Sequence, residues 1–187
     1  MSLILRNLQQ VVPLRRAPLR KRVEIIREIM RIQKFDLGLI CVDNNRIQHI
    51  NNTYRHKNIP TDVLSFPFYE DLKADELPGQ LLHPDECNLG DIFLGVEYLM
   101  RQCEEEGRDF YNTLTVVSAH GICHLLGYKH ETEEEWNDLS ISFRCFRRRA
   151  IFLMSSTNTQ AVTLSHSPRT FQKCEICQVM IYNLQWK

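Results

Sequence analysis

Residues 119–130 read AHGICHLLGYKH and place three histidines at positions 120, 124 and 130. Residues four apart in an α-helix lie one turn apart on the same face, so His120 and His124 can bind one ion. Gly127 ends the predicted helix and tolerates a left-handed backbone, which lets the chain turn back and bring His130 to that ion. Three neutral imidazoles with an open fourth position are typical of a catalytic zinc site. We therefore predict a zincin-like helix that binds Zn²⁺; the alternative is three surface histidines in chance register.

The residue after the first histidine limits which kind of bond the predicted metal site can cleave. Zinc peptidases with this spacing carry a glutamate there as general base, whereas this chain has Gly121. A phosphodiester is a better substrate for such a site, because the metal itself can polarise a phosphoryl oxygen and position the nucleophile. A fixed cation would stabilise charge at phosphorus, and Arg55, in NNTYRHKNIPTDVLSFP (residues 51–67), is the candidate. The alternative for Arg55 is a surface ion pair with Asp62 or Glu70.

Length and charge indicate one domain followed by a tail. The chain has 187 residues, of which 43% are apolar, enough for a single core. Residues 1–139 carry 16 Lys and Arg against 22 Asp and Glu, whereas residues 140–187 carry 7 against 1. We therefore predict a domain over residues 1–139 and a divergent basic tail over residues 140–187. No apolar run approaches the roughly 20 residues that cross a bilayer, so no membrane insertion is expected.

Two features of the sequence, the N-terminal segment and the cysteines, give information on the cellular compartment of the protein. Six basic residues precede the first acid, Glu24: Arg6, Arg15, Arg16, Arg20, Lys21 and Arg22. This pattern fits a mitochondrial presequence, and it fits equally a strand over residues 3–5 followed by the solvated face of a helix. Seven cysteines without a secretion signal favour reduced thiols, and Cys123, between the histidines, is expected to face the core.

Apolar periodicity predicts alternating helices and strands, so the fold class is α/β or α+β. Helices are predicted over residues 17–33, after an N-cap at Asp43, over residues 96–106, and from an N-cap at Asn112 or Thr113 to Gly127. Strands are predicted over residues 37–42, 63–68 and 89–94, and a loop over residues 69–88. Pro67 is better suited to an edge or a strand end than to a central position.

Three separated motifs together resemble the YbeY family of endoribonucleases and rRNA maturation factors. They are residues 51–67 (quoted above), 88–94 (NLGDIFL) and 120–130 (HGICHLLGYKH), and their order and arrangement look like those of the animal mitochondrial member. The resemblance covers about residues 3–139. It implies an α+β fold, a single compact domain in which a small mixed β-sheet packs with helices.

The resemblance also implies a function. It implies a metal-dependent, single-strand-specific endoribonuclease that acts on ribosomal RNA and meets proteins of the small ribosomal subunit. It assigns the metal to His120, His124 and His130 and the functional arginine to Arg55, so we predict Arg55 and His124 as catalytic residues. The expected compartment is the mitochondrion, with the cytoplasm as the alternative.

Two departures and two other functions stay open. Lys129 stands where the family commonly has aspartate, and SISFRCFRRRAIFLM (residues 140–154) replaces the closing amphipathic helix. The chain could instead be a non-catalytic ribosome assembly factor with a structural metal. A zincin-type metallopeptidase is disfavoured by Gly121.

Overall fold

The computed structural model describes residues 2–72 and 87–128, which form a four-stranded sheet and four helices. The strands are β1 (Leu3–Asn7), β2 (Asp36–Val42), β3 (Val63–Pro67) and β4 (Asn88–Gly95). The helices are α1 (Arg16–Ile29), α2 (Asn44–Arg55), α3 (Val96–Glu106) and α4 (Phe110–Leu125). The strand order is β1-β2-β4-β3, with β1, β2 and β4 parallel and β3 antiparallel to β4. The predicted α+β fold with a small mixed sheet is confirmed, and Pro67 lies at the end of an edge strand as expected.

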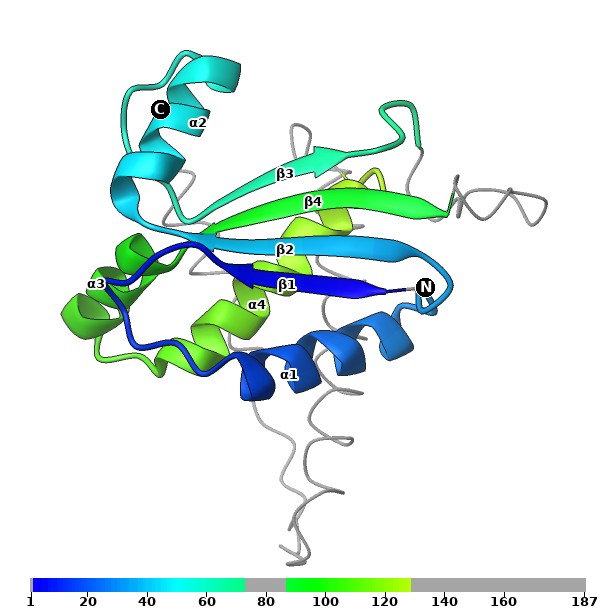
Figure 1. Ribbon diagram of the computed structural model, residues 1–187, viewed down its shortest axis with the longest axis horizontal. Coiled ribbons are helices and arrows are strands. Elements are labelled where there is room, and N and C mark those ends of the chain that lie inside the picture. The colour runs from blue at the N-terminus through cyan, green and yellow to red at the C-terminus, as the bar shows by residue number, and fades with distance from the viewer. Residues whose placement is uncertain (1, 73–86, 129–187) are drawn as a thin grey trace, which may run out of the picture.

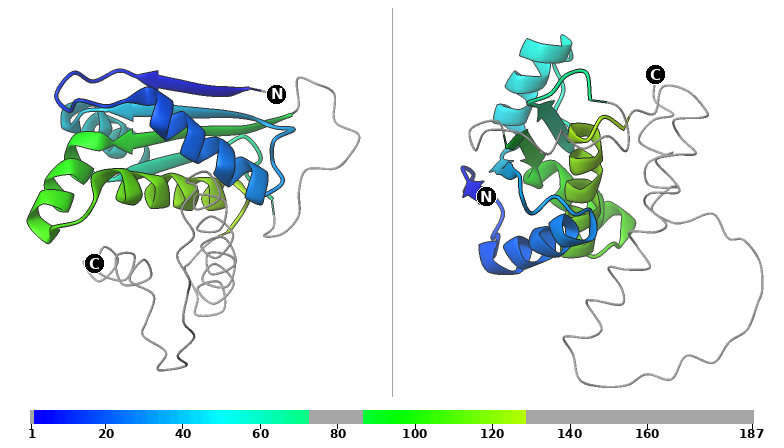
Figure 2. Two further views of the ribbon diagram at one scale, coloured as in Figure 1. Left: turned by 90° about the horizontal axis from the view of Figure 1, so that it is seen from below. Right: turned by 90° about the vertical axis from the view of Figure 1, so that its right-hand side faces the viewer.

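The two faces of the sheet are covered unequally. Figures 1 and 2 show α1, α3 and α4 on one face and α2 on the other, beside the edge strand β3. Successive side chains of a strand point to opposite faces, so Leu39 and Cys41 join the larger core while Ile40 and Val42 join the smaller one. Among the described residues, Ile47 of α2 is the only fully buried helical side chain in the smaller core, so these residues cover that face thinly.

The N-terminal segment belongs to the domain. Strand β1 pairs in parallel with β2 over five residues, and its Leu3 and Leu5 side chains are buried. Helix α1 buries an apolar stripe that contains Leu19, Val23 and Ile26. The interpretation of this segment as a strand and an amphipathic helix is therefore confirmed, and the basic residues of 6–22 lie within or between these elements.

Helix α4 is mostly buried because it lies between the sheet and two other helices, in contact with β3, β4, α1 and α3. It begins at Phe110, and the Asp109 carboxylate caps it by accepting a hydrogen bond from the Asn112 amide at 2.7 Å. The predicted N-cap at Asn112 or Thr113 was therefore wrong, since Phe110 and Tyr111 already form the first turn. Cys123 is buried as predicted, and burial raises its thiol pKa to about 12.

A bulge in β4 brings β3 close. Asp36 pairs with Asn88 but Gly38 pairs with Asp91, so β4 contains one extra residue there. Gly90 occupies the bulge with φ +118°, and a Cβ at this position would lie 2.1 Å from the Phe66 carbonyl oxygen. Glycine is therefore needed both for the backbone conformation and for the approach of the edge strand.

We expect Gly90→Ala to destabilise the fold more than Gly107→Ala. Gly107 also has a positive φ, of +64°, but a Cβ there would meet nothing within 4 Å. Gly107→Ala should therefore incur only the backbone strain of about 1–2 kcal/mol. Gly90→Ala adds a clash with the β3 backbone and should lower the free energy of unfolding by at least about 1 kcal/mol more. Urea denaturation followed by circular dichroism measures both; equal losses would show that β3 does not constrain position 90.

Candidate metal centre

His120 and His124 come together on α4 as their spacing predicted. Their Nε2 atoms lie 3.0 Å apart, and the ring centroids are 4.4 Å apart with an interplanar angle of 79°. Two nitrogens bound to one tetrahedral zinc at about 2.0–2.1 Å lie roughly 3.3 Å from each other. The two imidazoles therefore fit a shared divalent ion with only a small adjustment of the rings.

The tautomer of His124 is set by the turn that ends α4. Its Nδ1 lies 2.9 Å from the Tyr128 carbonyl oxygen, which can only accept a hydrogen bond. Nδ1 therefore carries the proton, and Nε2 keeps the lone pair that a metal needs. Gly127, at φ +82°, turns the chain at the end of α4. As a result, the Tyr128 amide donates a hydrogen bond to the Cys123 carbonyl oxygen, and the Tyr128 carbonyl oxygen reaches the His124 imidazole.

The third predicted ligand, His130, lies outside the described residues, two positions beyond the last of them in this part of the chain. Within residues 2–72 and 87–128, no group of three His, Cys, Asp or Glu side chains could hold a metal ion. The described part thus contains two of the three nitrogens that the sequence assigns to the ion.

Gly121 packs against the sheet. A Cβ at this position would lie 3.0 Å from Ile92 Cγ2 and 3.1 Å from Ser65 Oγ, so α4 lies close to β3 and β4 here. A glutamate in this position would point into those strands and could not reach a substrate beside His120. The glutamate that zinc peptidases require is absent from the sequence, and a side chain at position 121 would be crowded by Ile92 and Ser65.

Arg55 is the last residue of α2 and is exposed. None of the ion pairs found among the described residues involves it, so the predicted alternative of a surface pair with Asp62 or Glu70 is not seen there. Burial raises the pKa of the Asp62 carboxyl, partly offset by hydrogen bonds from Thr61 and Val63 and by the Arg55 charge. Asp62 thus shapes the turn before β3.

The helices that carry Arg55 and the histidines contact the edge strand β3 on its two opposite faces. On β3, Ser65 faces Gly121 of α4, while the next residue, Phe66, contacts the Tyr54 ring of α2. Helices α2 and α4, which carry Arg55 and the His120–His124 pair, therefore lie on opposite sides of one edge strand (Figure 1). The aromatic residues Tyr54 and Phe66 were missed as site candidates, although Tyr54 directly precedes Arg55 in the sequence.

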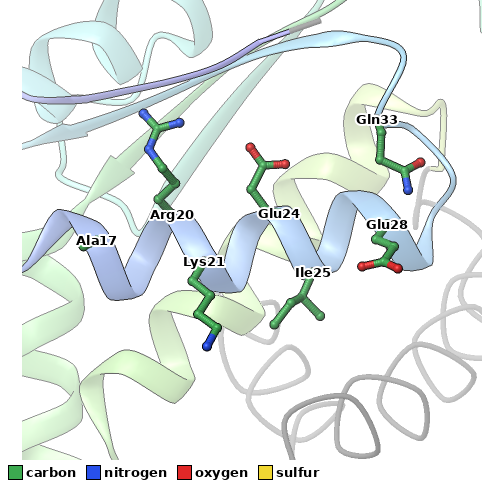
Figure 3. A pocket seen from close by; sticks show the side chains of 7 residues that line it. All are labelled: Ala17, Arg20, Lys21, Glu24, Ile25, Glu28 and Gln33. Carbon is green, nitrogen blue, oxygen red and sulfur yellow. The ribbon is translucent and has the colours of Figure 1, made fainter. Parts of the chain in front are cut away.

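A surface cavity of about 530 Å³ lies elsewhere, along α1 (Figure 3). Its lining comes from α1 and the turn after it: Ala17, Arg20, Lys21, Glu24, Ile25, Glu28 and Gln33. Its basic residues, Arg20 and Lys21, precede its acidic residues, Glu24 and Glu28, along the helix, and none of the predicted site residues takes part. This cavity does not account for the predicted chemistry.

Comparison with known proteins identifies the family. The sequence model described as Endoribonuclease YbeY matches residues 7–142. Endoribonuclease YbeY of Homo sapiens is 62% identical over 139 residues, which cover 74% of this chain and 82% of that protein. Endoribonuclease YbeY of Bartonella bacilliformis is 46% identical over 100 residues, and the chain spans only 58% of its length.

A solved structure supports the same fold. The solution structure of TM1509 from Thermotoga maritima matches with a TM-score of 0.51 and 20% sequence identity, over 89% of this chain and all of that one. At this identity the likeness shows the fold alone. Together with the matches in sequence, which extend over most of the described domain, it leads to one assignment: the chain belongs to the endoribonuclease YbeY family, a family of enzymes that hydrolyse phosphodiester bonds.

Proposed function

We propose that this chain is a zinc-dependent, single-strand-specific endoribonuclease that matures ribosomal RNA. The observation that carries the proposal is the His120–His124 pair, whose Nε2 atoms are 3.0 Å apart while a backbone carbonyl holds the His124 tautomer. The donor set is nitrogen only, which suits zinc and leaves the charge of the ion undiminished. The family supports metal dependence and an RNA substrate.

Each residue has a separate task in this proposal. His120, His124 and His130 hold the ion, and the Tyr128 carbonyl orients His124. When bound, the ion acts as a Lewis acid on the scissile phosphate. Arg55, exposed at the edge of the sheet, binds a phosphate oxygen through its planar guanidinium and neutralises charge that develops there. Gly121 offers no proton acceptor, which makes peptide hydrolysis the weaker alternative.

The domain boundary and the compartment belong to the same proposal. The catalytic domain would extend over residues 1–139, with residues 140–187 as an appended basic tail, and the family match that ends at residue 142 supports this division. We propose a mitochondrial location and proteins of the small ribosomal subunit as partners, with the cytoplasm as the other compartment. The support is the likeness to the human relative, since the basic residues of 6–22 are accounted for by the fold. No helix in the described part of the chain is long and apolar enough to cross a bilayer.

His124→Ala should remove both the bound metal and RNA cleavage. The substitution deletes one of the two nitrogens that lie 3.0 Å apart, so metal affinity should fall by more than about 100-fold and cleavage with it. Elemental analysis of the purified variant and cleavage of a labelled single-stranded RNA measure the two effects. His49→Ala, an exposed histidine on α2, is the matched control and should change neither.

Other outcomes of this experiment separate the alternatives. Cleavage of equal rate by wild type and His124→Ala would indicate a contaminating nuclease and refute the assignment. Metal bound to the wild type without any RNA cleavage would favour an assembly factor with a structural ion. Peptide turnover that chelation abolishes would instead revive the peptidase.

Arg55→Glu should abolish cleavage while metal content stays normal. Loss of one fixed charge at a reacting phosphate typically costs about 100-fold to 1,000-fold in rate, and a reversed charge also repels the strand. Arg46→Glu is the matched control, because Arg46 is exposed in the first turn of the same helix and gives the same change in net charge. If both variants cleave at wild-type rate, or both lose cleavage equally, Arg55 has no specific role.

A further inference from the structure

Three aromatic side chains form a row on the α2 face of the sheet. The Tyr54 ring lies 4.8 Å from the Phe66 ring at 67°, and Phe66 lies 5.6 Å from Phe93 at 89°, both in edge-to-face geometry. Phe66 and Phe93 pack on the smaller core, while Tyr54 is 67% exposed. The row therefore connects the core to a tyrosine ring that is held from beneath and remains largely in water.

The exposure of Tyr54 follows from the way α2 leaves the sheet. Along the apolar side of this helix, Ile47 is fully buried, Ile50 is half-buried and Tyr54 is exposed. Periodicity places all three on the same side, so a helix lying flat would have covered the tyrosine. An exposed large ring with a fixed orientation is a feature that proteins use to stack on a planar ligand.

The stretch of sequence that contains Tyr54 carries a net positive charge. Residues 44–61 contain Arg46, Arg55 and Lys57 and no Asp or Glu, although residues 1–139 as a whole are net acidic. Arg55 and Lys57, one and three residues after Tyr54, are both exposed. An aromatic ring flanked by cations is the combination that binds single-stranded nucleic acid, because each nucleotide presents a flat base and an anionic phosphate.

A carboxylate on the α2 face of the sheet limits the path that a bound RNA strand can take. Asp91 is exposed, pairs with Phe66 in the β3–β4 ladder, and lies over Gly38 of β2. Its charge repels phosphates from the middle of the sheet. A bound backbone is therefore favoured along the α2 and β3 edge, past Arg55 and Lys57.

We propose that Tyr54, supported by Phe66, is a stacking platform for one unpaired base of single-stranded RNA, and that Arg55 and Lys57 bind the flanking phosphates. The inference rests on the proposed function for the identity of the ligand as RNA. A duplex does not fit this platform, because its bases are already stacked on one another. Tyr54 is a binding residue here and takes no part in the chemistry.

Binding to bases and binding to phosphates can be measured separately. The metal-loaded full chain is titrated into fluorescein-labelled 2′-O-methyl oligouridine, whose integrity is checked on a gel, and into a phosphodiester chain of equal length without bases. Tyr54→Ala should bind oligouridine about tenfold more weakly and leave binding of the baseless chain unchanged. Tyr54→Trp should restore the affinity. Lys57→Ala should weaken binding of both ligands alike and reduce the dependence on salt.

Ile4→Ala is the matched control. Ile4 is 48% exposed on the same sheet face, but it lies on β1, beyond Asp91 in the register. It should bind both ligands as the wild type does. The platform is refuted if Tyr54→Ala binds oligouridine normally, if it loses both ligands equally, or if duplex RNA shows the same dependence on Tyr54.

The titration does not require cleavage, so the two proposals can fail separately. A chain that binds oligouridine through Tyr54 but never cuts RNA would refute the proposed activity and keep the platform. A chain that cuts RNA normally and binds independently of Tyr54 would refute the platform alone.

Discussion

The close approach of α4 to strands β3 and β4 at Gly121 is the contact on which the candidate site depends. Successive residues of a helix are rotated by about 100° about its axis. Gly121 faces the sheet, so His120 lies about 100° and His124 about 60° from that direction, both on the same flank of the helix. They are half-buried there, neither sealed in the core nor free in solvent. A larger residue at position 121 would push the helix away from Ile92 and Ser65 and move both imidazoles with it.

The edge strand β3 links the parts of the site. The side chains of β3 alternate between the two faces of the sheet, so Ser65 lies against α4 and Phe66 contacts α2. One short strand therefore packs against both the helix that carries the histidines and the end of α2 that carries Arg55. The bulge at Gly90 allows this strand to lie close to β4. An RNA strand that passes the edge of the sheet would meet cations and an aromatic ring on one face and the metal ligands on the other. Such an arrangement suits a flexible single strand better than a rigid duplex.

The family match spans the residues where the chemistry is expected and ends near the start of the predicted tail. The family match covers residues 7–142, which includes the three motifs and every predicted site residue. The described residues within it contain the histidine pair, the turn that orients His124 and the packed position 121. These features are compatible with phosphodiester cleavage, because position 121 offers no general base for peptide hydrolysis.

Local pattern in the sequence was enough to predict the strands, the helices and the His120–His124 pair, because a spacing of four on a helix and short apolar runs depend on residues near in the chain. Local pattern was less reliable at two places. The N-cap of α4 is Asp109 rather than Asn112 or Thr113. Tyr54 is exposed although helical periodicity places it on the same side of α2 as Ile47 and Ile50. Only the tertiary structure decided that Ile92 and Ser65 lie next to Gly121, and that α2, which ends at Arg55, packs on the opposite face of the sheet from α4. The physical reason is that helices and strands far apart in the sequence pack against one another. The distance between two such elements, and the faces that they bury, depend on side chains from both, which a pattern within one element does not contain.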